Sequence, residues 1–215
     1  MKLKLKEIVE NFLPAAEFCN FEPLSGGASS DVFLIEAKQN NTKIKLVLRY
    51  EAGPPSKNDI KNEFTLLQAL ANTNIPSAEP LFIDTSCKIL DRPFMLLSFL
   101  EGDINITNAD NLDLNTKMID QLKCIHSIDL AQLPDLPIQI DPMKGLLEYL
   151  PKADEWMELR NYLSSLKNTA FEGQRVFLHG DFWPGNILWV KDQIVAVIDW
   201  DYAAIGDPLS DLAVS

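Results

Sequence analysis

Three β-prone runs lie close together near the C-terminal end of the chain, and they constrain its fold more than any other feature. The runs span residues 176–179, 187–190 and 194–199. The second and third are separated only by the turn at 191–193, which predicts a hairpin. Asp181 and Asn186 occupy the loop between the first two runs, and Asp199 ends the third. The pattern therefore predicts that these three side chains meet at one site.

The side chains of this site suit phosphoryl transfer. That reaction needs a base that accepts the proton of the acceptor hydroxyl, and oxygen ligands for the metal ion that bridges the phosphates. Asp181 is predicted to be the catalytic base, and Asn186 and Asp199 the ligands of Mg²⁺. The alternative is structural, with His179 and Asp181 as a turn and cap pair and Asp199 as a strand-ending residue.

The rest of the chain changes character near residue 102. Before it, β-prone runs at 21–24, 32–37, 44–50, 80–84 and 92–100 surround one apolar stripe of helical spacing, Ile60, Phe64, Leu67 and Ala71. After it, helical stripes follow, one formed by Met118, Leu122 and Ile125 and one by Trp156, Leu159, Leu163, Leu166 and Ala170. An α+β fold is expected, with an N-terminal antiparallel sheet plus helix and a mostly helical C-terminal part that contains the hairpin.

The segments 179–186 (HGDFWPGN) and 198–201 (IDWD) resemble the catalytic and metal-binding segments of protein kinases. They are closer to the aminoglycoside phosphotransferase and choline kinase-like family, because His-Gly-Asp replaces His-Arg-Asp and Asp-Trp-Asp replaces Asp-Phe-Gly. The resemblance implies a protein kinase-like two-lobe fold, with a nucleotide-binding lobe at 1–97, a hinge at 98–103 and a catalytic lobe at 104–215.

The same resemblance, together with small residues that let the backbone approach phosphates, implies a nucleotide site. The residues assigned to it are Gly26, Gly27, Ser29, Ser30, Arg49, Glu63, Ser98 and Leu100. Arg49 takes the place of the kinase lysine with Glu63 as its partner, and a surface salt bridge is the alternative. For the glycine-rich segment the alternative is a plain hairpin turn, and for Ser98 and Leu100 a buried edge strand followed by a turn.

Further residues are expected to support the site. His179 and Asp211 are predicted to be structural, Asp211 by bracing the catalytic loop through hydrogen bonds. Asp201 is a candidate second metal contact, with a solvated acid beside the site as the alternative. His126 is also predicted to be structural.

Composition excludes several classes of protein. A net charge of −12 argues against a nucleic-acid partner, which requires a basic surface. The longest apolar stretch, 93–100, is too short to cross a membrane, and the N-terminus lacks the apolar core of a signal peptide, so a cytoplasmic location is expected. Three isolated cysteines indicate neither a disulfide framework nor a zinc site.

The predicted function is an ATP-dependent phosphotransferase that moves the γ-phosphate to a hydroxyl of a small molecule, either an aminoglycoside-like or an amino-alcohol acceptor. Mg²⁺ and ATP are the expected cofactor and co-substrate, and GTP is not excluded. Family members continue beyond the Asp211 segment with further helices, so the chain is expected to be C-terminally short: a fragment, a truncated product or a minimal form. The alternatives are a nucleotide-binding protein that lacks productive acceptor binding and a globular protein with no nucleotide site. Oligomeric state is not indicated.

Overall fold

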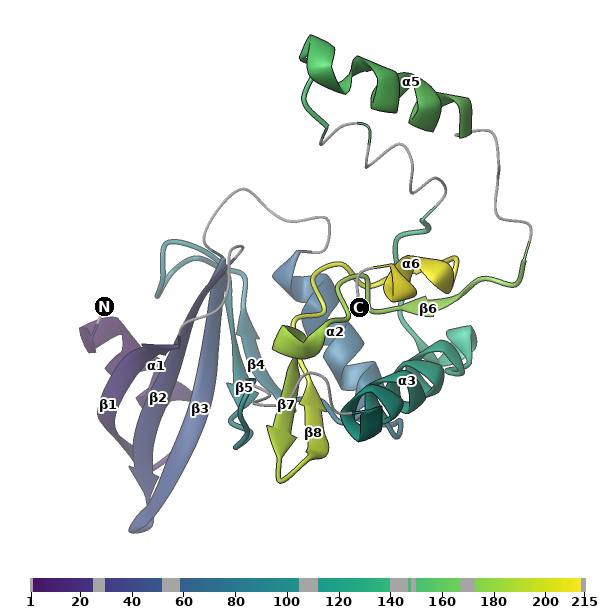
Figure 1. Ribbon diagram of the computed structural model, residues 1–215. Helices are drawn as coiled ribbons and strands as arrows, with labels where there is room; N and C mark the ends of the chain where they lie inside the picture. The colour runs from purple at the N-terminus through teal and green to yellow at the C-terminus, as the bar shows by residue number, and fades with distance from the viewer. Residues whose placement is uncertain are drawn as a thin grey trace.

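The computed structural model describes residues 2–24, 30–51, 59–104, 112–139, 147, 150–166 and 173–213 (Figure 1). The strands are β1 (Ala16–Leu24), β2 (Ser30–Gln39), β3 (Thr42–Glu51), β4 (Pro80–Asp84), β5 (Phe94–Ser98), β6 (Val176–Leu178), β7 (Ile187–Val190), β8 (Gln193–Val197) and β9 (Ala204–Gly206). The helices are α1 (Lys2–Phe12), α2 (Ile60–Leu70), α3 (Leu112–His126), α5 (Met157–Leu166) and α6 (Leu209–Leu212), with 3-10 turns η1 (Leu130–Gln132), η2 (Asp154–Trp156) and η3 (Pro184–Asn186). This mixture confirms the predicted α+β class.

The N-terminal strands form one antiparallel sheet in the order β1-β2-β3-β5-β4. β2 and β3 are joined by Asn40 and Asn41, which have φ of 49° and 66°. Asparagine tolerates this left-handed conformation, and two such residues make a turn whose twist matches that of the strands. The strands predicted from the sequence are confirmed, and the sheet pairing extends the first three of them by several residues.

A helix covers each face of this sheet. Alternate residues of β3 point to opposite faces, so Leu46 and Leu48 pack in the cluster that contains α1, whereas Val47 packs in the cluster that contains α2. The helix α1 is not predicted from the sequence, because its buried residues are a short stripe of three, Leu5, Ile8 and Val9. Contact with the sheet supplies the apolar surface that so short a helix needs.

The C-terminal part is built on α3 and two small pairs of strands. Met118 and Ile125 of the predicted stripe on α3 are buried in the cluster that also holds Phe177 of β6. β7 and β8 form the predicted hairpin, with Lys191 and Asp192 in left-handed conformation at its turn. β9 is not predicted, because it is three residues long and exists only through its pairing with β6.

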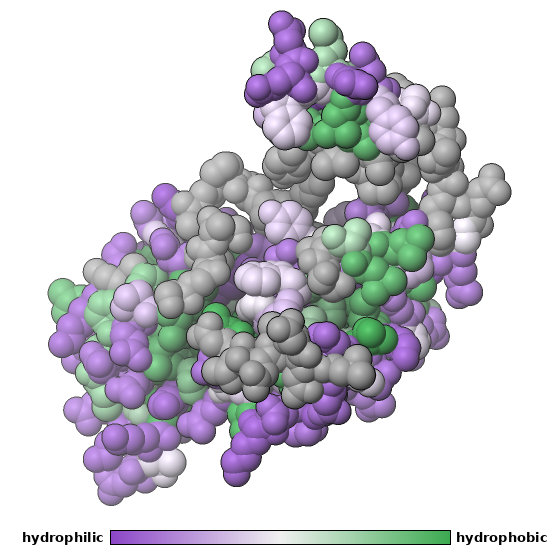
Figure 2. Space-filling view, in the orientation of Figure 1, coloured by the Kyte–Doolittle hydropathy of each residue, from purple (hydrophilic) through white to green (hydrophobic). Residues whose placement is uncertain are grey.

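The predicted helix near residue 160 is present as η2 and α5, although Ala170 lies outside the described residues. Figure 1 shows α5 at the top of the view, away from the sheet and from α3, and its Leu159 is 41% exposed. Hydrophobic residues also gather at the surface over α6, where Leu209 and Leu212 are exposed (Figure 2). In the part of the chain that the structure describes, no helix has both the length and the apolar character needed to span a membrane.

Candidate active site

Arg49 projects from β3 into the space between the sheet and α2. Its Nη1 lies 2.5 Å from Oε1 of Glu63, which stands in the first turn of α2. The side chains of Arg49 and Glu63 are only 10% and 3% exposed. A surface salt bridge, the alternative considered from the sequence, is therefore wrong.

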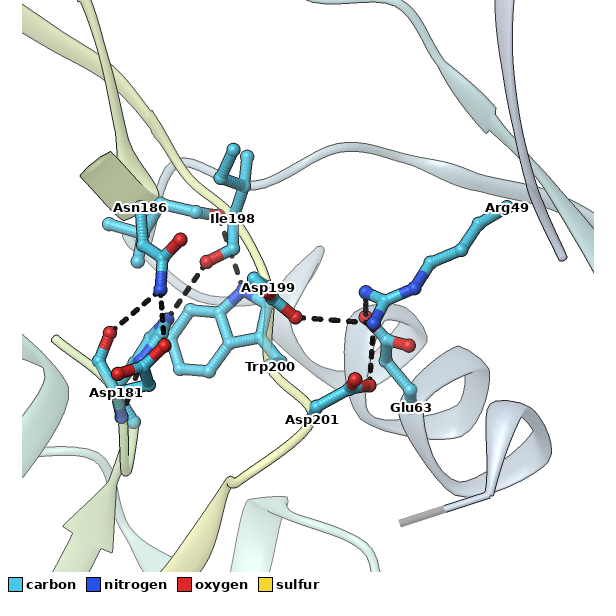
Figure 3. Close-up of polar contacts among 10 residues, drawn as sticks. Arg49, Glu63, Asp181, Asn186, Ile198, Asp199, Trp200 and Asp201 are labelled. Atoms are coloured by element: carbon cyan, nitrogen blue, oxygen red, sulfur yellow. Dashed lines mark hydrogen bonds and ion pairs between the residues drawn. The ribbon is translucent and has the colours of Figure 1, made fainter. Parts of the chain in front are cut away.

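The other terminal nitrogen of Arg49 contacts two more carboxylates. Nη2 lies 2.6 Å from Oδ1 of Asp201 and 3.2 Å from Oδ1 of Asp199 (Figure 3). Asp201 is buried, so the alternative of a solvated acid is also wrong. Three carboxyl groups thus surround one guanidinium.

This charge arrangement shifts the protonation of the groups in it. Burial opposes the charge on Arg49, but Glu63, Asp201 and Asp199 together raise the pKa of the guanidinium above its ordinary value. Burial raises the pKa of Glu63 to about 8, against the opposing effect of Arg49. Asp201 and Asp199 act in the same direction as burial on Glu63.

The chain conformation around Trp200 explains how Asp199 and Asp201 reach the same arginine. Asp199 has a φ of 63°, a left-handed conformation that is rare outside glycine. The Trp200 ring is buried and stacks on Phe177 with ring centroids 5.5 Å apart. Its Nε1 donates to the carbonyl of Val197 at 3.2 Å. The indole thus anchors the segment in the core while the acids on either side of it face Arg49.

The loop after β6 depends on a glycine. Gly180 has a φ of 84°, and a Cβ there would lie 2.2 Å from the carbonyl oxygen of Tyr202. Only glycine combines this conformation with so close an approach of two backbones. The next residue, Asp181, is thereby held close to the segment that follows Asp199.

Asp181 and Asn186 are in direct contact. Nδ2 of Asn186 donates to the carbonyl oxygen and to Oδ2 of Asp181, both at 2.9 Å. The 3-10 turn η3 between them brings the two side chains together, since the backbone N–H of Asn186 donates to the carbonyl of Trp183 at 2.9 Å. In Figure 3 the amide oxygen of Asn186 points away from Asp181.

Asp211 braces the same loop from the first turn of α6. It is fully buried and accepts hydrogen bonds from the backbone N–H groups of His179 at 3.0 Å and Gly180 at 2.7 Å. The same carboxylate lies 2.9 Å from Nε2 of His126 at the end of α3. The structure thus places Asp211 and His126 where the sequence assigned them a structural role.

His179 is a buried neutral imidazole with a defined tautomer. Its Nε2 donates to the carbonyl oxygen of Ile198 at 3.0 Å, because a carbonyl can only accept. Its Nδ1 then accepts from the backbone N–H of Asp181 at 3.3 Å. Burial lowers the pKa of His179, against the opposing effect of Asp211. The ring therefore links the loop of Asp181 and Asn186 to the segment that carries Asp199.

A cavity of about 360 Å³ connects these groups to the sheet. Its lining includes Ser98 and Leu100 near the end of β5, and the polar residues Arg49, Glu63, Asn186 and Asp199. The apolar lining residues include Val32, Val47, Ala78, Leu97, Leu188 and Ile198. This volume falls within the range of small-molecule sites, roughly 300–1,000 Å³.

Six of the candidate residues from the sequence line this cavity: Arg49, Glu63, Ser98, Leu100, Asn186 and Asp199. Asp181, His179, Asp201 and Asp211 are not among its lining residues. Gly26, Gly27 and Ser29 lie outside the described residues, and Ser30 begins β2 opposite Glu51 of β3.

Two features of the site were missed from the sequence. The first is the apolar lining, for which alternation along strands is the only signal and does not distinguish a cavity wall from an ordinary core. The second is the contact of Asp201 with Arg49. The spacing of Asp199 and Asp201 was a usable signal, because two acids that flank a buried aromatic residue both point to the side opposite that residue.

Comparisons with curated proteins give distant relatives. Mouse acyl-CoA dehydrogenase family member 10 is 27% identical over 184 residues, which cover 75% of this chain and 17% of the mouse protein. The probable acyl-CoA dehydrogenase IBR3 of Arabidopsis thaliana is 25% identical over 223 residues, which cover 88% of this chain and 27% of the plant protein. The chain therefore spans between 17% and 27% of the length of these two relatives.

Solved structures share the whole fold. Aminoglycoside phosphotransferase APH(2")-IIa, in a ternary complex with streptomycin and ATP, superposes with a TM-score of 0.67 at 20% identity, over 98% of this chain and 74% of that chain. Macrolide 2'-phosphotransferase MphH from Brachybacterium faecium superposes with a TM-score of 0.65 at 16% identity, over 97% of this chain and 74% of that chain. The protein kinase-like fold of the aminoglycoside phosphotransferases, predicted from the sequence, is confirmed.

The family model described as the phosphotransferase enzyme family matches residues 20–215 of the sequence. That match includes β3, α2, the loop with Asp181 and Asn186, and the segment with Asp199. The chain belongs to the phosphotransferase enzyme family.

Proposed function

We propose that this chain transfers the γ-phosphate of ATP to a hydroxyl of a small molecule, with Asp181 as the catalytic base. One observation carries the proposal. Asn186, which hydrogen-bonds to Asp181, lines a single cavity together with the Arg49–Asp199 pair, and most of the other lining residues are apolar. A nucleotide likewise combines an apolar base with charged phosphates.

The part of the cavity near the end of β5 suits the adenine base. Ser98 and Leu100 line it where β5 ends, and the backbone there supplies polar groups that can recognise a ring edge. Arg49 lies opposite Met95 in the register of β3 and β5, three residues along β5 from Ser98. It is a fixed cation for the phosphates, and its planar fork suits phosphate oxygens. With this orientation the γ-phosphate is directed toward the loop of Asp181. We extend the proposal to the division into lobes at 1–97 and 104–215, joined by a hinge at 98–103.

Two oxygen-donor side chains that line the cavity fit Mg²⁺. The carboxylate of Asp199 and the amide oxygen of Asn186 are hard oxygen ligands, and both residues line the cavity. Among the described residues, no group of three or more histidine, cysteine or acidic side chains is arranged to hold a metal by itself. Mg²⁺ at nucleotide sites is held by one or two protein oxygens together with water and substrate phosphates. Once bound, it would neutralise charge on the phosphates.

Asp181 performs the proton transfer in this proposal. The acceptor oxygen forms a bond to the γ-phosphorus, the bond from that phosphorus to the bridging oxygen of ADP breaks, and the hydroxyl proton passes to the Asp181 carboxylate. Asn186 holds Oδ2 of that carboxylate, which orients the group toward the acceptor. Asp211 and His179 keep the loop in place through the backbone contacts described above.

The acceptor is proposed to be an aminoglycoside-like molecule or an amino alcohol. Solved structures of the same fold include complexes with streptomycin and with gentamicin, which bear hydroxyl and amino groups. A net charge of −12 is compatible with a cationic acceptor of this kind.

The test is a transfer screen with Mg²⁺ and ATP against aminoglycosides, amino alcohols and sugars, with product detection by ³¹P NMR. The proposal predicts a new phosphomonoester signal that depends on one acceptor class. If ATP and Mg²⁺ raise the melting temperature but no acceptor is phosphorylated, the chain is a nucleotide-binding protein without productive transfer.

A further inference from the structure

Asp201 and Asp199 lie in different environments although one residue separates them. The Asp201 side chain is 7% exposed and the Asp199 side chain 30% exposed. Asp199 lines the cavity together with Arg49 and Glu63, whereas Asp201 is not among the residues that line it. A carboxylate behind the cavity wall is poorly placed to meet a metal ion held inside the cavity.

The contact distances separate the two acids in the same way. Nη2 of Arg49 lies 2.6 Å from Asp201 but 3.2 Å from Asp199. The shorter, more buried ion pair is the stronger one, since charge-assisted hydrogen bonds strengthen as they shorten and as water is excluded. Nη1 is meanwhile held by Glu63. Two buried carboxylates thus fix the guanidinium, and Asp199 contributes least to holding it.

We propose that Asp201 is a positioning residue that holds Arg49, so that the Asp199 carboxylate can leave the arginine and bind Mg²⁺. This inference rests on the proposed function. It assigns Asp201 to Arg49 in place of the second metal contact considered from the sequence. When Asp201 loses its charge, the guanidinium depends more on Asp199, the other carboxylate that lies against Nη2, and then competes with the metal ion for it.

The experiment is a Mn²⁺ titration of the whole chain followed by electron paramagnetic resonance, in the presence of a non-hydrolysable ATP analogue. Asp201→Asn is expected to weaken Mn²⁺ binding roughly 10- to 100-fold, as substitutions of groups that orient a metal ligand do. The number of Mn²⁺ ions bound per nucleotide is expected to stay the same. The matched control is Asp120→Asn, which removes an exposed carboxylate paired with Lys123 and is expected to leave Mn²⁺ binding unchanged.

A double-mutant cycle separates positioning from a general structural effect. In an Arg49→Lys background the cation is a point charge and not a fork that holds Glu63 and Asp201 on separate nitrogens. Asp201→Asn is therefore expected to change Mn²⁺ affinity much less in that background. Asp201→Glu keeps the charge and is expected to retain most of the wild-type affinity.

The outcomes are distinct. Loss of one bound Mn²⁺ ion in Asp201→Asn would show that Asp201 is a metal ligand. Unchanged Mn²⁺ affinity would show that Arg49 does not need Asp201 to hold it in place. Either result overturns the inference and leaves the proposed function standing. Absence of Mn²⁺-nucleotide binding in the wild-type chain contradicts the proposed function itself. If Asp201→Asn does not melt cooperatively, Asp201→Ser and Asp201→Glu are compared in the same titration, with weakening expected in the first alone.

Discussion

Asn186 donates two hydrogen bonds from one nitrogen to Asp181, one to the backbone carbonyl and one to Oδ2 of the carboxylate, each 2.9 Å long. The amide therefore fixes the position of the aspartate while its own oxygen is directed elsewhere (Figure 3). Both ends of one side chain serve the proposed reaction, the nitrogen by orienting the base and the oxygen by offering a metal ligand.

Substitutions at Asn186 separate these two roles. Asn186→Ala removes the nitrogen and the oxygen, so we expect Mg²⁺-dependent nucleotide binding to weaken roughly 10- to 100-fold and turnover to fall further. Asn186→Asp keeps an oxygen ligand but places a second carboxylate against Asp181, so its nucleotide binding should be less affected than its turnover. Isothermal titration with Mg²⁺ and an ATP analogue, alongside turnover, checks both. Equal loss of binding in the two variants would contradict the separation.

Gly180 is expected to tolerate no side chain. Gly180→Ala puts a Cβ in left-handed backbone and 2.2 Å from the Tyr202 carbonyl oxygen, so we expect it to lower the free energy of unfolding by roughly 2–4 kcal/mol. Gly206→Ala is the control, because the two atoms nearest to a Cβ there are the ends of the Leu178 and Gln139 side chains, at 2.8 and 2.9 Å, which can move, and Cβ of Gln139 lies at 3.0 Å. Urea unfolding of both variants measures the difference. A Gly180→Ala variant as stable as Gly206→Ala would contradict the geometry of the loop.

Asp211 is expected to be a major contributor to stability. Asp211→Asn replaces one acceptor oxygen with an NH₂ group that faces the N–H donors of His179 and Gly180. We expect a loss of about 3 kcal/mol in the free energy of unfolding. The control Asp120→Asn removes an exposed ion pair and should cost less than about 1 kcal/mol. Similar unfolding curves for the two variants would show that Asp211 does not brace the loop.

His179 gives the fold a specific sensitivity to acid. Its pKa is lowered by burial below the ordinary value of 6.5, despite the opposing charges of Asp211, Asp199 and Asp181. As the pH falls through 6.5, the unfolded chain binds a proton at this residue and the folded chain does not, so stability falls by at most about 1.4 kcal/mol per pH unit. His179→Gln removes this part of the dependence. The free energy of unfolding, measured between about pH 5 and 7.5, should therefore depend less on pH in His179→Gln than in the wild type. Equal pH dependence in the two proteins would contradict a buried neutral imidazole.

The sequence predicted the parts of this molecule that depend on local pattern. The hairpin of β7 and β8 and the strands of the sheet follow from alternation, turn residues and β-propensity. The grouping of Asp181, Asn186 and Asp199 followed from the same hairpin, because its geometry brings the loop before it and the strand end after it together.

The features that could not be predicted depend on contacts between distant segments. α1 is stabilised by a sheet face and β9 by β6, so neither carries a sufficient signal of its own. The burial of Asp201 could not be predicted for the same reason, because Asp201 is buried against Arg49, which is more than a hundred residues earlier in the chain. Long-range packing overrides local propensity in each case.

The most direct test of the proposed function compares the wild-type chain with Asp181→Asn in single-turnover transfer of the γ-phosphate from Mg²⁺-ATP, with water and with the acceptor found in the screen. Removal of a general base is expected to slow transfer roughly 10²- to 10⁴-fold while the affinity for Mg²⁺-ATP, measured by titration calorimetry, stays close to that of the wild type. Transfer at the wild-type rate by Asp181→Asn would contradict the assignment of this aspartate as the catalytic base.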